Sequence, residues 1–74
     1  MERKEALLAF VKEHRGSEAH YEKIKNQLLS AKGIAGLENV LHTEAVVYEK
    51  ARTHGGAWPE FEKFVTAVER VLIG

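Results

Sequence analysis

Apolar residues recur along the chain at spacings of three and four, and glycines divide this pattern into four segments. Recurrence at positions i, i+3, i+4 and i+7 is typical of amphipathic helices. Gly16, Gly33 and the pair at 55–56 lie where the C-terminus of a helix favours a residue in the left-handed conformation. The pattern predicts four helices, at about residues 2–15, 17–32, 35–54 and 59–73.

The ends of these segments carry recognisable capping residues. Ser17 is a good N-cap for the second helix. Pro59 suits the first turn of the last helix, where its missing N–H is not needed. If Gly33 is left-handed, Ile34 should fold back on Leu29, which is the apolar contact of a Schellman motif.

Short connections between the segments favour antiparallel neighbours. We therefore predict an all-α protein in which residues 1–74 form one domain, a compact four-helix bundle with up-down antiparallel order. Two alternatives remain: an orthogonal array of the same helices, and a three-helix protein in which the second and third helices continue through Gly33. Opposite charges three residues apart should form ion pairs within single helices. These pairs are Glu22–Lys25, Glu49–Arg52 and Glu60–Lys63.

Composition narrows the classes of function. With 74 residues and no cysteine, the chain has a marginal core and neither disulfides nor thiolate metal ligands. Eleven basic and eleven acidic residues cancel, which disfavours nucleic acid and anionic membranes as partners. No signal peptide is recognisable, and no apolar run approaches the roughly 18 residues of a membrane span. We expect no membrane association and a cytoplasmic location.

Three histidines are expected at one end of the bundle. His14 ends the first helix, His20 lies in the first turn of the second, and His54 ends the third. Three imidazoles with a carboxylate such as Glu18 can bind zinc. No two histidines have the i, i+4 spacing of a helical zinc site, so these residues are weak metal candidates and we predict no cofactor. The alternatives are helix-end histidines that favour the negative end of the dipole, and a pH-dependent contact.

Glu44 interrupts the apolar face of the third segment, seven residues from both Leu37 and Ala51. Three interpretations are open: a position at the edge of the core, a charge paired across an interface, or a general base. His42 has Glu38 one turn before it, a pairing that can orient an imidazole for base catalysis. A small helical enzyme or metal protein using Glu44 and His42 is therefore one alternative function, although no motif supplies a nucleophile.

Nucleic-acid binding is a second alternative. Residues 25–41 can be aligned with a helix-turn-helix that has Gly33 in the turn. Leu29 stands where that motif needs a small residue, and Asn39 where it needs an apolar one. A binding face would also have to gather Lys23, Lys25, Lys32 and Arg52. The zero net charge disfavours this alternative.

The function we expect is non-catalytic. A small helical protein without a catalytic motif is best interpreted as a protein–protein interaction or regulatory module, and its marginal size favours a homodimer. We place the contact on the third segment, with additional apolar candidates from the first and last. The candidate interface residues are Leu8, Glu44, Val46, Val47, Tyr48 and Trp58.

Overall fold

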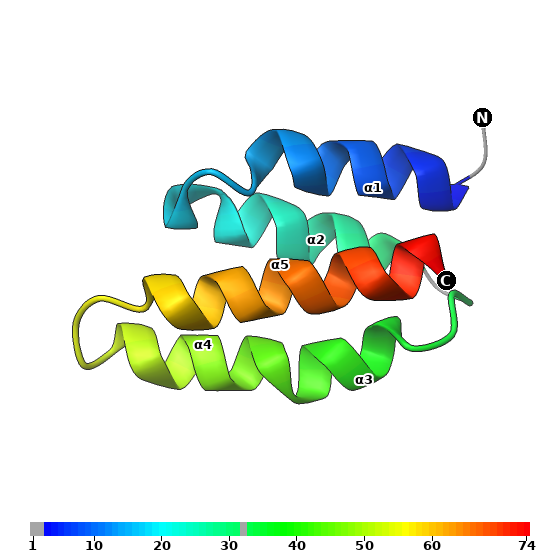
Figure 1. Cartoon of the computed structure of the whole chain (residues 1–74). Coiled ribbons are helices and arrows are strands. Elements are labelled where there is room, and N and C mark those ends of the chain that lie inside the picture. The colour runs from blue at the N-terminus through cyan, green and yellow to red at the C-terminus, as the bar shows by residue number, and fades with distance from the viewer. Residues whose placement is uncertain (1–2, 32) are drawn as a thin grey trace.

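The computed structural model describes residues 3–31 and 33–74 (Figure 1). These residues form five α-helices and one short 3₁₀ helix, with no β-strand among them, and the all-α prediction is confirmed. The predicted helix ends at Glu2 and Lys32 lie outside the described residues. The elements are α1 (Arg3–His14), η1 (Glu18–His20), α2 (Tyr21–Ser30), α3 (Leu37–His42), α4 (Glu44–Arg52) and α5 (Trp58–Ile73).

Two helix starts follow the predicted capping chemistry. Ser17 has an extended backbone, and its hydroxyl accepts a hydrogen bond from the N–H of Ala19 at 3.2 Å. The second segment begins there as the 3₁₀ turn η1 and becomes α-helical at Tyr21. Pro59 occupies the first turn of α5, as predicted.

The third segment, predicted as one helix, is divided at Thr43 into α3 and α4. Thr43 has φ −111° and ψ −75°, and its hydroxyl donates to the carbonyl oxygen of Asn39 at 2.8 Å. A threonine that bonds back to the carbonyl four residues earlier commonly bends a helix. Apolar spacing did not reveal this break, because leucine and valine continue on both sides of it.

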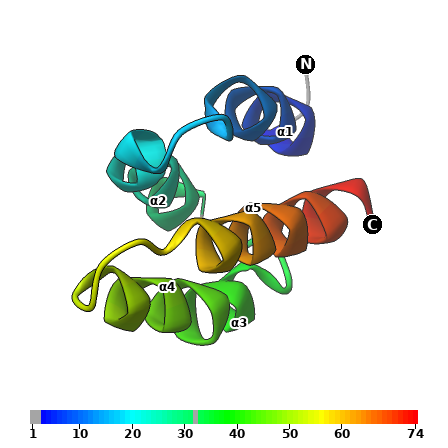
Figure 2. The same cartoon turned by 60° about the vertical axis from the view of Figure 1, so that its left-hand side comes forward.

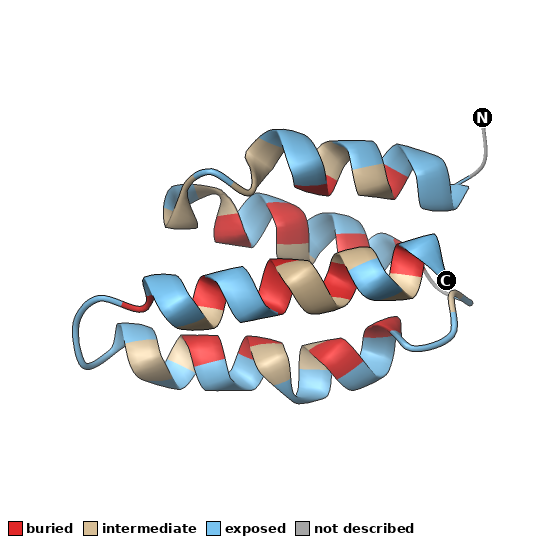
Figure 3. Cartoon of the chain, in the orientation of Figure 1, coloured by how far each residue is buried: buried red, intermediate tan, exposed pale blue. Residues whose placement is uncertain are grey.

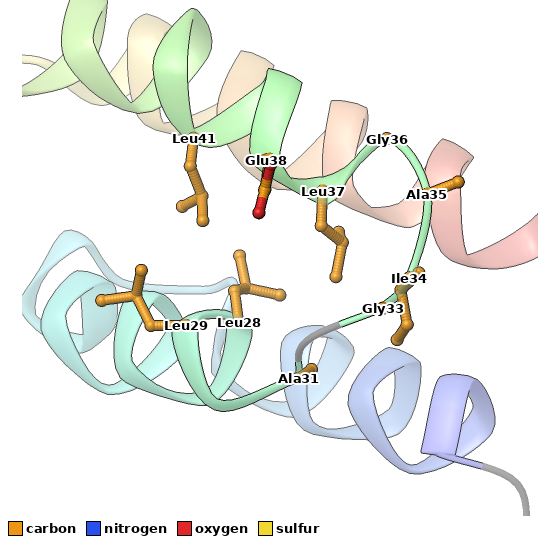
Figure 4. Close-up of a pocket in the computed structure, with 10 residues that line it drawn as sticks. All are labelled: Leu28, Leu29, Ala31, Gly33, Ile34, Ala35, Gly36, Leu37, Glu38 and Leu41. Atoms are coloured by element: carbon orange, nitrogen blue, oxygen red, sulfur yellow. The ribbon is translucent and has the colours of Figure 1, made fainter.

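The connection between α2 and α3 ends the second helix completely. Gly33 and Gly36 have φ of 93° and 94°, a conformation that excludes helix continuation. The three-helix alternative is therefore wrong. Gly33 is left-handed as predicted, but α2 already ends at Ser30, and Leu29 lies apart from Ile34 (Figure 4). The predicted Schellman contact is not made. Gly55 also has positive φ, whereas Gly16 does not.

Helix α5 is the central element of the fold. It packs against α1 on one side and against α3 and α4 on the other, and α1 also packs against α2 (Figures 1 and 2). The chain reverses direction between α1 and α2, between α2 and α3, and between α4 and α5 (Figure 1). An up-down bundle and an orthogonal array differ in the angles at which their helices cross. The reversals of the chain do not give these angles, so the up-down arrangement stays a prediction.

Buried residues face one another across the helices and form a single core (Figure 3). The largest fully buried side chains come from α1, α2 and α5: Val11, Tyr21, Ile24, Phe61, Phe64, Val65 and Val68. Aromatic rings meet at the centre, where Tyr21 lies 4.4 Å from Tyr48 and 5.4 Å from Phe64 between ring centroids. In the part of the chain described, no helix has the length and apolarity to cross a lipid bilayer.

Candidate functional site

An apolar hollow of about 560 Å³ lies between the end of α2 and the start of α3. Leu28 and Leu29 point up from α2, while Leu37 and Leu41 point down toward them from α3 (Figure 4). The loop that carries Ile34 closes one end (Figure 4). Among the described residues, the lining consists of Leu28, Leu29, Ala31, Gly33, Ile34, Ala35, Gly36, Leu37, Glu38 and Leu41.

The hollow is apolar at its rim as well as at its base. Leu29 is 50% exposed, while Ile34 and Leu41 are half-buried against the core. Of the described residues in the lining, Glu38 alone is charged, and its side chain points into the hollow (Figure 4). A concave surface of this size with mainly apolar walls and few polar groups is typical of a binding site.

A second hollow, of about 460 Å³ between α4 and α5, has the opposite character. Four charged side chains line it: Glu44, Glu62, Lys63 and Arg70. Such a surface is well hydrated, so covering it with a partner gains little from the hydrophobic effect. The hollow between α2 and α3 is therefore the better candidate site.

The loop that frames the apolar hollow is held against α5. At Gly36, a Cβ atom would lie 3.2 Å from Cγ1 of Val71, which is tighter than ordinary van der Waals contact. The φ of 94° also favours glycine at this position. Glycine therefore lets the loop turn and approach α5 closely, and this fixes the end wall of the hollow.

Polar contacts tie α2 to α4 beside the core. The hydroxyl of Tyr21 donates to the carboxylate of Glu49, and Lys25 Nζ lies 2.8 Å from the same carboxylate. Arg52 pairs with Glu22 at 3.5 Å. The prediction of Glu22–Lys25 and Glu49–Arg52 pairs within single helices is wrong, because both pairs exchange partners across the two helices.

These contacts shift the pKa values of their members. Burial raises the pKa of Tyr21, and the hydrogen bond to Glu49 raises it further. Burial likewise raises the pKa of Tyr48, with a contribution from the Glu18 carboxylate. Hydrogen bonds from Lys25 and Tyr21 lower the pKa of Glu49. The tyrosines are thus kept neutral and the carboxylate charged, an arrangement that suits a structural contact between α2 and α4.

The structure places Glu44 at the edge of the core. Its side chain is half-buried and faces α5. The next residue, Ala45, is the one that is buried in the core. The helix is interrupted at Thr43, directly before Glu44. His42 is exposed, and no hydrogen bond joins it to Glu44 or Glu38 within residues 33–74.

The six predicted interface residues do not form one surface. Tyr48 is 3% exposed and belongs to the core, so its assignment to a contact surface is wrong. Leu8 lines a hollow with Ile73 at the end of α5, whereas Trp58 begins that helix. Leu8 and Trp58 therefore lie near opposite ends of α5, and a helix of 16 residues is about 24 Å long. Val46, Val47 and Trp58 are exposed, but the apolar hollow does not include them.

Two of the three predicted histidines come together. The rings of His14 and His20 lie 5.0 Å apart, and His20 Nδ1 donates to the carbonyl oxygen of His14 at 3.2 Å. His14 stacks on Phe10 and donates to its carbonyl oxygen. His54 instead donates to the carbonyl oxygen of Lys50 at the end of α4. Among residues 3–31 and 33–74, no three histidine or carboxylate side chains form a metal-binding group.

The helix-turn-helix alignment does not fit the structure. The connection between α2 and α3 runs from 31 to 36, whereas that motif uses a turn of about three or four residues. Of the four basic residues proposed for a binding face, Lys32 lies outside the described residues. Lys25 and Arg52 are engaged in ion pairs with carboxylates.

The residues around the apolar hollow were missed because each looked structural in the sequence. Leu29 lies off the main stripe of its helix, directly after the buried Leu28, and this was the available signal. Ile34 and Leu41 line the hollow only because the loop brings α3 beside α2.

No family model, no curated protein and no solved structure matches this chain.

Proposed function

We propose that this protein is a small non-catalytic module that binds protein chains through the apolar hollow between α2 and α3. One observation supports this most strongly: the half-exposed Leu29 and the half-buried Ile34 and Leu41 line the same concave surface. A single exposed leucine is ordinary, but contiguous apolar surface around a hollow is typical of interaction sites.

The geometry favours a helix as the group that binds there. The walls are two helices, α2 and α3, and a third helix can place its apolar face between them. Leucines at i and i+3 or i+4 of that helix would contact Leu29 and Leu41. The protein would regulate a partner by competing with other proteins for such a helix. A cytoplasmic location stays a prediction from the sequence.

A selection from a library of amphipathic helical peptides tests this proposal. Peptides enriched on the wild-type protein should lose at least about tenfold in affinity for Leu29→Glu, because a carboxylate at the rim must be desolvated when the helix binds. Val46→Glu is the matched control, since Val46 is 40% exposed on α4 and is absent from the lining. Its affinity should be unchanged. Failure to enrich any peptide, or equal losses in both variants, would contradict the proposal.

A further inference from the structure

We infer that the occupant of the apolar hollow is a second copy of this chain, which places its own α2 in the hollow in a twofold arrangement. This inference rests on the proposed function of the same hollow. A twofold interface requires one patch to be complementary to itself, so that it carries both the projecting group and the recess that receives it.

The patch meets this requirement in shape. Leu29 projects from the rim with half of its surface exposed, and the recess lies directly beside it, bounded by Ile34 and Leu41 (Figure 4). In a twofold pair, the projecting leucine of each copy enters the recess of the other. Each copy would then cover its Leu29, half of which is exposed in the single chain.

The patch is also complementary to itself in charge. Residues 23–36 contain three lysines and no acidic residue in the sequence, whereas Glu38 is the charged side chain among the described residues that line the hollow. Lys25 lies one turn before Leu29 on α2. Glu38 makes no ion pair within the described residues, so it is available to a basic segment of another molecule. In a twofold pair, the basic segment of each copy, in which Lys25 also pairs with Glu49 of its own copy, would lie near Glu38 of the other copy.

Size provides a third argument. A stable dimer covers about 800 Å² on each partner, roughly a sixth of the 4748 Å² that this chain exposes. A domain of 74 residues also has a small core, and association is a common means of adding buried apolar surface to such domains.

Sedimentation equilibrium of the full chain tests the inference, at neutral pH and at concentrations up to the order of 1 mM. We expect a reversible monomer–dimer equilibrium for the wild type. Leu29→Glu should weaken dimerisation at least about tenfold, while Val46→Glu leaves it unchanged. Glu38→Gln should weaken it less and reduce its dependence on salt, because screening acts on the pair that this variant removes. Circular dichroism verifies that each variant is folded.

Two results would overturn the inference. One is a wild-type protein that stays monomeric throughout this range, and the other is a dimer that Leu29→Glu and Val46→Glu affect equally. A monomer whose hollow still binds selected helical peptides would refute the second copy as occupant and leave the proposed function intact. A monomer whose hollow binds no helix would refute both.

Discussion

At the scale of single residues, Tyr21 links the core to the contact between α2 and α4. Its ring is buried between Tyr48 and Phe64, and its hydroxyl reaches the carboxylate of Glu49. The helical spacing of Tyr21, Ile24 and Leu28 in the sequence is consistent with the burial of this ring. It did not predict the partner of the hydroxyl, because that depends on how α2 and α4 lie side by side.

Replacement of Tyr21 by phenylalanine should lower the free energy of unfolding by about 1–2 kcal/mol. The variant keeps the buried ring and removes one hydrogen bond to a charged acceptor, and Lys25 still pairs with Glu49. Urea denaturation measures the change. Glu22→Gln is the control, because it removes the largely exposed pair with Arg52 and should cost less than about 0.5 kcal/mol. Equal effects of the two variants would refute a special role for the hydroxyl.

The raised pKa of Tyr21 predicts loss of stability in alkali. The unfolded chain ionises this tyrosine near its ordinary pKa of 10.0, while the folded protein holds it neutral. Above that pH the unfolded state binds fewer protons than the folded state, so stability falls as pH rises, by at most about 1.4 kcal/mol per pH unit for this group. Urea denaturation at several pH values should show a shallower decline for Tyr21→Phe. Parallel declines would contradict this explanation.

Gly36 is the residue through which the loop fixes the end wall of the hollow. Gly36→Ala should lower the free energy of unfolding by about 1–2 kcal/mol, because alanine is strained at φ 94° and its Cβ would crowd Val71. Gly16→Ala should cause no loss, since Gly16 has open space around its Cα and no positive φ. Thermal unfolding of both variants makes the comparison, and an unstable Gly16→Ala with an unaffected Gly36→Ala would contradict it.

At the scale of the elements, four helical segments and their approximate positions could be predicted from apolar spacing and glycines, but the break that divides the third segment could not. Thr43 sits between apolar residues that continue the helical pattern, so periodicity alone predicts one helix over 35–54. The break arises from the hydroxyl of Thr43 bonding to the carbonyl oxygen of Asn39. Directly after the break, Ala45 is buried and Glu44 lies at the edge of the core.

Replacement of Thr43 by alanine should raise the free energy of unfolding by about 0.5 kcal/mol, through better helix propensity and loss of the competing hydroxyl. The measurement is urea unfolding followed by circular dichroism. Thr53→Ala serves as control, because the hydroxyl of Thr53 bonds to Lys50 just beyond the end of α4, where no helix continues. A loss of stability in Thr43→Ala would show that the break is itself stabilising.

At the scale of the whole molecule, the candidate site was the least predictable feature. Sequence reasoning placed the contact on the third segment, on the apolar stripe that Glu44 interrupts and that contains Val47 and Tyr48, with Val46 beside it. The hollow depends instead on the loop at 33–36, which brings α3 beside α2. Neither helix alone contains the recess, so no pattern within one segment could indicate it.

The central claim is that this hollow, and not the exposed face of α4, is the contact surface. Methyl NMR of the leucine, isoleucine and valine side chains tests it most directly, across a dilution series and with a selected helical peptide added. The account predicts shifts at Leu29, Ile34 and Leu41, with Val46 and Val47 unchanged. Shifts confined to Val46 and Val47, with the methyl groups of the hollow unaffected, would contradict the account and return the contact surface to α4.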